Sequence, residues 1–430
     1  MRKIRNSFII LALIVLPLNL YAQDSPRIAA LKKQIEKGGK AALQKFWDEV
    51  KQRDTPLLET IPGDKQKVLV TFLWQGAPDI KNVVVFSQVG NFNPTDDQMK
   101  LLPGTDVWYL SYKLGKGLRF LYSLSPNDDL TPVTGPNVDF MKRFAHLQPD
   151  PLNPHRFPQT AKEGQPNVQS IASLPGAAPL LWIARKTGTP AGTVAEQRVK
   201  SRVLQNERTV HVYLPPGYDK AKTYPLVVLF DGQSYLDLVP TPAIMDNLIA
   251  ARKIPPAIVL LIDNPTPADR DKEFSCNKNY AEFLAAELLP WAKENYRITP
   301  DPAQTVIAGS SLGGLAAACA AMEYPAIFGK VLSQSASFWW KPDGDTVYEW
   351  VSRQFAAQPK MPLRFYITVG TLETLPKPGK TDQLEVNRRL RDALKAKDYA
   401  LKYTEFGGAH EYIDWQATLP EGLIELLGKP

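Results

Sequence analysis

Residues 309–313 constrain this chain more than any other stretch, because their sequence, Gly-Ser-Ser-Leu-Gly, fits a strand–turn–helix motif built around a serine. Apolar residues precede the motif and alanines follow it, as in a buried strand and a packed helix. In such a G-x-S-x-G turn the serine backbone is strained, so glycines are needed two positions before and after it. The turn would also place the hydroxyl of Ser311 at a helix N-terminus, where backbone N–H groups stabilise a developing oxyanion. We therefore predict that Ser311 is a nucleophile; the alternative is a tight strand–helix turn without chemistry.

The first 22 residues have the pattern of an export signal. Three of the first five are basic, the stretch from Phe8 to Leu20 is almost entirely apolar, and the segment ends at Ala22. This apolar core is short for a membrane span. We predict cleavage near Ala22, a periplasmic or secreted mature form, and no stable membrane insertion after cleavage. An uncleaved membrane anchor is the alternative.

Charge and cysteine content limit the kinds of ligand and partner that the chain is expected to bind. Removal of the predicted signal lowers the formal charge from +7 to +4, and the basic residues form no clustered run. The chain is therefore expected to favour anionic small molecules rather than nucleic acid. Cys276 and Cys319 would pair in an oxidising compartment but could equally be buried thiols. The four histidines are scattered and no zinc-type spacing is present, so we expect no metal site and no cofactor.

A length of 430 residues predicts two domains. Residues 23–60 have helical periodicity, interrupted at a Gly-Gly pair. Short β-branched and aromatic stretches in residues 61–150, separated by Gly, Pro and Asn turns, indicate an all-β, immunoglobulin-like sandwich. Residues 151–195 are rich in Pro, and we interpret them as a linker. In residues 196–430 strands alternate with helices, which predicts a mostly parallel sheet covered on both faces, the α/β-hydrolase architecture.

A nucleophilic serine needs a base and an acid, which follow it along the chain in this fold. His410 is the one histidine beyond Ser311, and it lies in a Gly-rich turn after the last predicted strand. Glu373 lies in the turn after the preceding strand and is the predicted acid, with Asp382 as the second choice. For the oxyanion hole we expect the amide of Leu312 and an amide after the strand 226–230, from Gly232 or Gln233.

With these residues placed, the chain resembles the enterochelin esterase family over almost its whole mature length. The C-terminal part of the resemblance rests on Val212–Tyr218, Leu229–Ser234, Arg270 with Glu273, Phe283–Trp291, Ala308–Gly314, Ser333–Trp340, and Gly407–His410 with Trp415. The N-terminal part rests on Phe46-Trp47, Pro56–Glu59, Asp150–Pro154 and Leu174–Ala177. The resemblance implies an immunoglobulin-like N-terminal domain and a serine esterase that opens the ester bonds of a catecholate trilactone.

Such a substrate would be anionic and aromatic, with iron present only as part of the substrate complex. Cations and flat rings should therefore bind it. Arg270, Trp339 and Trp340 are candidates because they lie near predicted strand ends, although a core role for the tryptophans and an ion pair for the arginine are equally compatible. Two other functions stay open from the sequence. One is a carbohydrate esterase of the feruloyl or acetyl-xylan type, with the β-domain as a sugar-binding module, and the other is a non-catalytic siderophore-binding protein. The oligomeric state is unknown.

Overall fold

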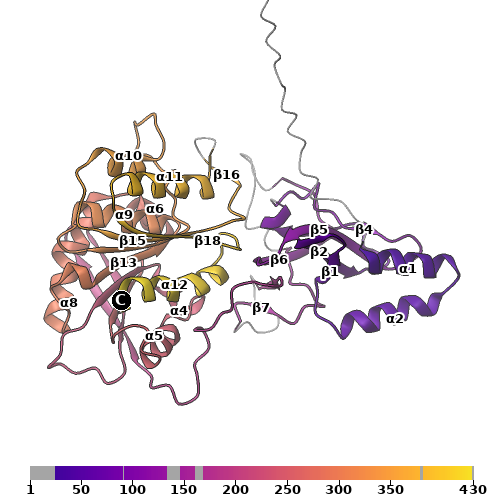
Figure 1. Cartoon of the computed structure of the whole chain (residues 1–430), viewed down its shortest axis with the longest axis horizontal. Helices are drawn as coiled ribbons and strands as arrows, with labels where there is room; N and C mark the ends of the chain where they lie inside the picture. The colour runs from indigo at the N-terminus through magenta and orange to yellow at the C-terminus, as the bar shows by residue number, and fades with distance from the viewer. Residues whose placement is uncertain (1–24, 91, 133–145, 160–167, 378–380, 429–430) are drawn as a thin grey trace, which may run out of the picture.

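The computed structural model describes residues 25–90, 92–132, 146–159, 168–377 and 381–428. An N-terminal body of strands and two helices lies beside a larger C-terminal body in which helices flank a sheet (Figure 1). The predicted export signal, residues 1–22, lies outside the described residues. Within the described part of the chain, every helix is too short or too polar to cross a membrane.

Two helices open the described chain, α1 (Pro26–Glu36) and α2 (Lys40–Lys51). The hydroxyl of Ser25 caps α1 by accepting from the amide of Ile28, and the Gly-Gly pair separates the two helices as the sequence predicts. Their apolar faces pack on residues of the first β-sheet, including Leu57 and Leu73. The segment is thus a helical layer on the outside of the β-domain.

The β-domain is a sandwich of two antiparallel four-stranded sheets, as predicted. The first has the order β1-β2-β5-β4, with bounds β1 (Leu57–Ile61), β2 (Asp64–Gln75), β4 (Lys100–Leu101) and β5 (Val107–Gly115). The second has the order β3-β6-β8-β7, with bounds β3 (Val83–Ser87), β6 (Arg119–Pro126), β7 (Arg156–Phe157) and β8 (Gln169–Ser173). Side chains from the two inner faces, such as Phe72 and Tyr122, form one core between the sheets.

The linker predicted for residues 151–195 starts later in the structure. Strands β7 and β8 both fall inside that range; β8 pairs with β6 and β7 pairs with β8, so they belong to the second sheet of the sandwich. β7 has two residues and β8 has five, lengths that leave little alternation to detect in a Pro-rich stretch. The connection between the domains therefore runs from about residue 174 to residue 192.

The C-terminal domain contains an eight-stranded sheet with the order β18-β15-β14-β13-β11-β12-β10-β9. Pairing is parallel from β18 to β12, and β9 and β10 join antiparallel at one edge. The bounds are β9 (Thr193–Ser201), β10 (Asn206–Leu214), β11 (Leu226–Phe230), β12 (Ile258–Ile262), β13 (Thr305–Ser310), β14 (Lys330–Gln334), β15 (Arg364–Gly370) and β18 (Ala400–Phe406). The predicted mostly parallel sheet is confirmed, and β9 is an additional edge strand.

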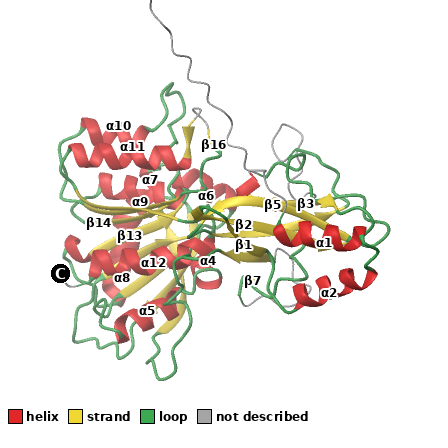
Figure 2. Cartoon of the chain, turned by 45° about the vertical axis from the view of Figure 1, so that its right-hand side comes forward, coloured by secondary structure: helices red, strands yellow, loops and turns green. Residues whose placement is uncertain are grey.

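Helices cover both faces of this sheet (Figure 2). Alternate residues of the apolar strand β11 serve different cores: Val228 packs toward α7 to α11, whereas Val227 packs toward α5 and α12. The helices are α4 (Gly232–Asp237), α5 (Thr241–Ala250), α6 (Pro267–Phe274), α7 (Lys278–Glu282), α8 (Leu289–Asn295), α9 (Leu312–Glu323), α10 (Trp350–Ala357), α11 (Gln383–Ala396) and α12 (Tyr412–Leu427). A π-helical turn (Phe283–Leu288) joins α7 to α8, and η1 (Gln88–Gly90), η3 (Pro302–Gln304) and the hairpin β16 (Pro376–Lys377) with β17 (Thr381–Asp382) complete the described elements.

Cys276 and Cys319, left open by the sequence, form a disulfide. The bond joins the loop after α6 to the middle of α9, so it ties the helix that follows Ser311 to its neighbour. Both cysteines of the chain are thereby oxidised.

Candidate active site

Ser311 lies between β13 and α9 with φ +55° and ψ −124°, a conformation that a non-glycine residue rarely adopts. A Cβ at Gly309 would lie 2.6 Å from the backbone of Gly313, so the two glycines of the motif pack directly against each other. The strained serine turn predicted from the sequence is thus present. It places Ser311 at the N-cap of α9 and at the carboxyl end of the parallel sheet.

Glu373 and His410 meet beside the neighbouring strand ends. His410 follows β18 and Glu373 follows β15, and these strands pair in parallel, so their loops leave the same edge of the sheet. His410 Nδ1 lies 2.6 Å from Glu373 Oε2. The carboxylate is almost completely buried, with 1% of its side chain exposed, whereas the imidazole is 29% exposed. A buried carboxylate on Nδ1 fixes the tautomer that leaves Nε2 free to accept a proton.

The second oxygen of Glu373 is held as firmly as the first. Glu373 Oε1 accepts hydrogen bonds from the Ser335 hydroxyl at 2.6 Å and from the Gly370 amide at 2.7 Å. These donors orient the carboxylate toward the histidine. The edge of the His410 ring also contacts Trp415, with ring centroids 5.2 Å apart.

Asp382, the second choice for the acid, is a helix N-cap. Its carboxylate caps α11 by accepting from the Glu385 amide at 2.7 Å. The geometry therefore brings Glu373, and not Asp382, to the imidazole of His410.

The hydroxyl of Ser311 lies 3.5 Å from that of Ser337, and the Ser311 amide donates to the Gln334 carbonyl at 3.0 Å. Among the described residues no hydrogen bond joins Ser311 to His410. Catalytic hydrogen bonds of this kind are often long without substrate and shorten when it binds. The serine after β13 and the histidine after β18 are thus presented at the same carboxyl edge of the parallel sheet, with the acid already engaged.

The predicted oxyanion donors divide into two groups. Leu312 is the first residue of α9, so its amide has no acceptor inside the helix. Gly232 is the first residue of α4, and a Cβ there would lie 2.7 Å from the backbone of Leu261. The Gln233 amide instead donates to Asp263 Oδ1 at 2.7 Å. This geometry corrects the expectation for Gln233 and leaves Leu312 and Gly232.

Arg270, which we predict to bind the substrate, forms an ion pair with Asp231. Its Nε and Nη2 donate to Asp231 Oδ1 at 2.6 Å and Oδ2 at 2.9 Å. Asp231 directly precedes Gly232 and has φ +55°, so this bidentate pair holds the turn that carries a candidate oxyanion donor. Arg270 also lines a cavity of about 520 Å³ beside this turn, together with Arg198.

Trp339 and Trp340 are partly buried and pack against the large core of the C-terminal domain. Trp340 additionally meets Trp350 edge to face, with ring centroids 5.9 Å apart. These contacts give both rings a packing role, and no contact in the structure tests a binding role.

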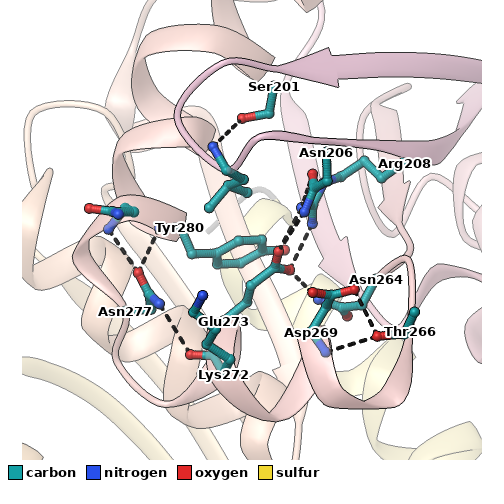
Figure 3. A network of polar contacts seen from close by, with 12 residues as sticks. Ser201, Asn206, Arg208, Asn264, Thr266, Asp269, Lys272, Glu273, Asn277 and Tyr280 are labelled. Carbon is teal, nitrogen blue, oxygen red and sulfur yellow. Dashed lines mark hydrogen bonds and ion pairs between the residues drawn. The ribbon is translucent and has the colours of Figure 1, made fainter.

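Behind the Arg270 flank lies a buried polar network (Figure 3). The fully buried guanidinium of Arg208 donates to both oxygens of Glu273, at 2.9 and 2.7 Å, and its charge lies over the ring of Phe283. Asn206 and Asn264 also donate to Glu273. Figure 3 shows this carboxylate at the centre of side chains that come from β10, α6 and the loop after β12. The network joins the carboxyl end of β12 to α6, the helix that carries Arg270.

On the other side of Ser311, three titratable groups surround the turn that carries His410. Burial raises the pKa of Glu411 to about 8, and the nearby Glu373 adds to the rise, while a hydrogen bond from the Leu121 amide opposes it. Burial also raises the pKa of Asp414 well above its usual range. Burial lowers the pKa of Arg119, which lies close enough to Asp414 for its charge to matter. The groups on this flank therefore hold fewer charges near neutral pH than their number suggests.

Sequence reasoning did not identify a role for the N-terminal domain at this site. Gln88, in η1, accepts from the His410 amide at 3.2 Å and donates to the Leu372 carbonyl at 3.0 Å. A polar residue at the end of a strand in another domain carries no signal of such a contact. Within the described residues, no cluster of His, Cys, Asp and Glu could hold a metal ion.

The chain is similar to known esterases in both of its domains. A family model described as "Putative esterase" matches residues 201–426, and one described as "Enterochelin esterase, N-terminal" matches residues 69–183. The chain is 30% identical to the iron(III) enterobactin esterase of Dickeya dadantii over 94% of this chain and 97% of that protein. The chain belongs to the enterochelin esterase family.

Other members of this family are also similar to the chain. The iron(III) salmochelin esterase of Escherichia coli is 30% identical over 94% of this chain and 99% of its own length. The ferric enterobactin esterase of Salmonella typhimurium has a similar structure, with a TM-score of 0.72, 27% identity, and coverage of 88% of this chain and 98% of that one. The enterobactin esterase of Shigella flexneri, crystallised in the presence of enterobactin, gives 0.69 and 27% over 87% and 96%. As a member of this family, the chain is a carboxylic ester hydrolase.

Proposed function

We propose that this esterase hydrolyses the ester bonds of catecholate siderophores of the enterobactin type through an acyl-enzyme on Ser311. The observation that carries the proposal is the buried Glu373–His410 pair at 2.6 Å beside a strained serine turn, in a chain similar over 94% of its length to enterobactin and salmochelin esterases. The Shigella flexneri relative was crystallised with 2,3-dihydroxy-N-benzoyl-serine, a catecholate serine compound. The iron would enter only as part of the substrate.

The chemistry follows from the placement of the side chains. His410 Nε2 takes the proton of the Ser311 hydroxyl as its oxygen attacks the ester carbonyl, and Glu373 stabilises the imidazolium that forms. The amides of Leu312 and Gly232 donate to the oxyanion of the tetrahedral intermediate. His410 then gives its proton to the leaving alkoxide oxygen of the substrate's serine, which breaks one ester bond and opens the trilactone. A water molecule, activated by the same imidazole, releases the acyl group from Ser311.

A panel of substrates tests the proposal. Purified protein is incubated with a ferric catecholate trilactone, a feruloylated sugar and an acetylated xylan, and the products are separated by chromatography. Release of dihydroxybenzoylserine at the highest kcat/KM supports the proposal. Release of ferulate or acetate at a higher kcat/KM would favour a carbohydrate esterase, and tight binding of the ferric complex without turnover would favour a binding protein.

We also propose that the esterase is exported. Support comes from the basic and then apolar pattern of residues 1–22 and from the Cys276–Cys319 disulfide, since structural disulfides persist in oxidising compartments. Mass spectrometry of protein from the native host tests this. A mature N-terminus near Gln23 is the expected result, and an intact Met1 in the cytosolic fraction would contradict it.

A further inference from the structure

The sandwich domain contacts the two loops that carry the predicted acid and base, and one side chain joins them. Gln88 is 7% exposed and lies in η1, directly after β3 of the second sheet. Its Nε2 donates to the carbonyl of Leu372, the residue before the acid. Its Oε1 accepts from the backbone amide of His410, the base itself. Gln88 therefore links the acid loop to the base loop from outside the catalytic domain.

The backbone of the sandwich holds the base loop along its length. Strand β3 pairs with β6 only as far as Tyr122, and the next two amides on that edge of β6 bind the base loop instead. The Arg119 amide donates to the Gly407 carbonyl at 2.9 Å, and the Leu121 amide donates to Glu411 Oε2 at 2.8 Å. The base loop thus occupies the edge position that β3 leaves open.

The approach of the two domains is close at this point. A Cβ at Gly407 would lie 2.3 Å from the carbonyl oxygen of Gly117, so only glycine permits the contact. The side chain of Leu372 also packs on the core of the sandwich. Both loops are therefore fixed by contacts with the other domain as well as by the strands from which they emerge.

We propose that Gln88 is a positioning residue for the esterase reaction, acting on the Glu373–His410 pair by fixing the backbone of both loops. The proposal rests on the proposed function for the roles of Ser311, Glu373 and His410. The Nδ1–carboxylate contact of 2.6 Å depends on the relative position of the two loops. Backbone bonds from Thr371 to Phe406 and from Leu372 to Gly408 join the loops within the catalytic domain, and Gln88 adds one bond to each loop directly beside the acid and at the base. Small displacements of a catalytic group reduce the rate strongly, by up to about 10²-fold for 1 Å. The N-terminal domain is thereby part of the catalytic apparatus.

The test uses the full-length chain and a small ester, p-nitrophenyl acetate, so that siderophore recognition does not enter. Gln88→Met keeps the volume of the side chain and removes both hydrogen bonds. We expect kcat to fall about tenfold with KM nearly unchanged. Gln75→Ala is the matched control, since Gln75 lies in the same domain and binds Asp106 on the surface. That variant should retain wild-type kcat.

A merely structural role is separated by two further readouts. In the Glu373→Gln background the Gln88→Met change should cost little additional rate, because both substitutions act through His410. Gln88→Glu keeps the acceptor for the His410 amide, and its carboxyl can donate to Leu372 only when protonated. The kcat of this variant relative to wild type should therefore rise as the pH falls from 8 to 5.5.

The outcomes distinguish this proposal from the one on which it rests. Wild-type kcat in folded Gln88→Met, or full additivity with Glu373→Gln, would overturn the positioning role. A Gln88→Glu variant whose relative kcat does not change with pH would overturn it as well, and this readout remains if Gln88→Met fails to fold. Persistent turnover of the small ester in Ser311→Ala would instead overturn the proposed nucleophile.

Discussion

The two flanks of Ser311 are held in place by different means. On one side, the oxyanion turn is fixed within the catalytic domain, by the Arg270–Asp231 pair and the buried Arg208–Glu273 network behind it. On the other, the loops of Glu373 and His410 are fixed partly from the sandwich domain.

Substitutions on the two flanks should therefore have different consequences. A change in the Arg208–Glu273 network acts inside one hydrophobic core, so it should reduce the stability of the catalytic domain. A change at the domain contact removes part-buried hydrogen bonds between loops rather than core packing, so it should reduce activity more than stability.

Among changes on the two flanks of Ser311, the largest effect is expected at the acid. Glu373→Gln should lower kcat about 10³-fold, because an amide cannot hold the tautomer or stabilise the imidazolium. Asp382→Asn is the matched control, since asparagine caps a helix as well as aspartate and kcat should change less than about twofold. Steady-state kinetics on p-nitrophenyl acetate measures both. The reverse ranking would assign the acid to Asp382.

Breaking the buried Arg208–Glu273 pair, on the other side of Ser311, should reduce stability more than activity. Arg208→Met leaves Glu273 buried without its cation and should lower the free energy of unfolding by about 3 to 5 kcal/mol. The double variant Arg208→Met/Glu273→Gln removes both charges and should recover part of that loss. Urea denaturation followed by circular dichroism measures the series. Unchanged stability in Arg208→Met would show that the network does not brace this flank.

A smaller effect is expected at the arginine of the oxyanion turn. Arg270→Met should lower kcat about tenfold for both a neutral ester and a ferric catecholate ester, because it releases Asp231 and the turn next to it. A cation that only binds substrate would behave differently. In that case KM for the anionic substrate would rise, while the kinetics on p-nitrophenyl acetate would stay at the wild-type level.

The last effect is gradual, because it is spread over several pH units. The folded state holds the proton of Glu411 up to a pKa of about 8, whereas the unfolded chain releases it near 4.5. The unfolding free energy contributed by this group is therefore fully present below pH 4.5 and lost as the pH rises to about 8, at most about 1.4 kcal/mol per pH unit.

Glu411→Gln resembles the protonated side chain and can still accept from the Leu121 amide. Its stability should fall less steeply than that of the wild type between pH 5 and 8, and its kcat should stay close to wild type. Thermal unfolding at a series of pH values makes the comparison. Identical slopes for the two proteins would contradict the raised pKa.

The sequence predicted the features that depend on local pattern. The strained turn at Ser311 needs glycines at fixed spacing, and the loops of His410 and Glu373 follow strands whose chain order fixes their place at the sheet edge. The two sheets of the sandwich and the parallel sheet also follow from alternation and apolar runs.

The features that depend on tertiary contacts could not be predicted in this way. Strand β7 has two residues and forms only because β8 offers an edge. The Gln233 amide is unavailable because Asp263, at the end of another strand, accepts it. The role of Gln88 depends on how two domains meet, about which a local pattern carries no information.

In the proposed reaction, Ser311 opens the ester bonds of a catecholate siderophore. The most direct measurement compares wild type and Ser311→Ala in the release of dihydroxybenzoylserine from a ferric catecholate trilactone, with circular dichroism to confirm that both are folded. We predict that turnover falls to the limit of detection in the variant, while its binding of the ferric complex remains. Release of dihydroxybenzoylserine by Ser311→Ala at the wild-type rate would contradict the account.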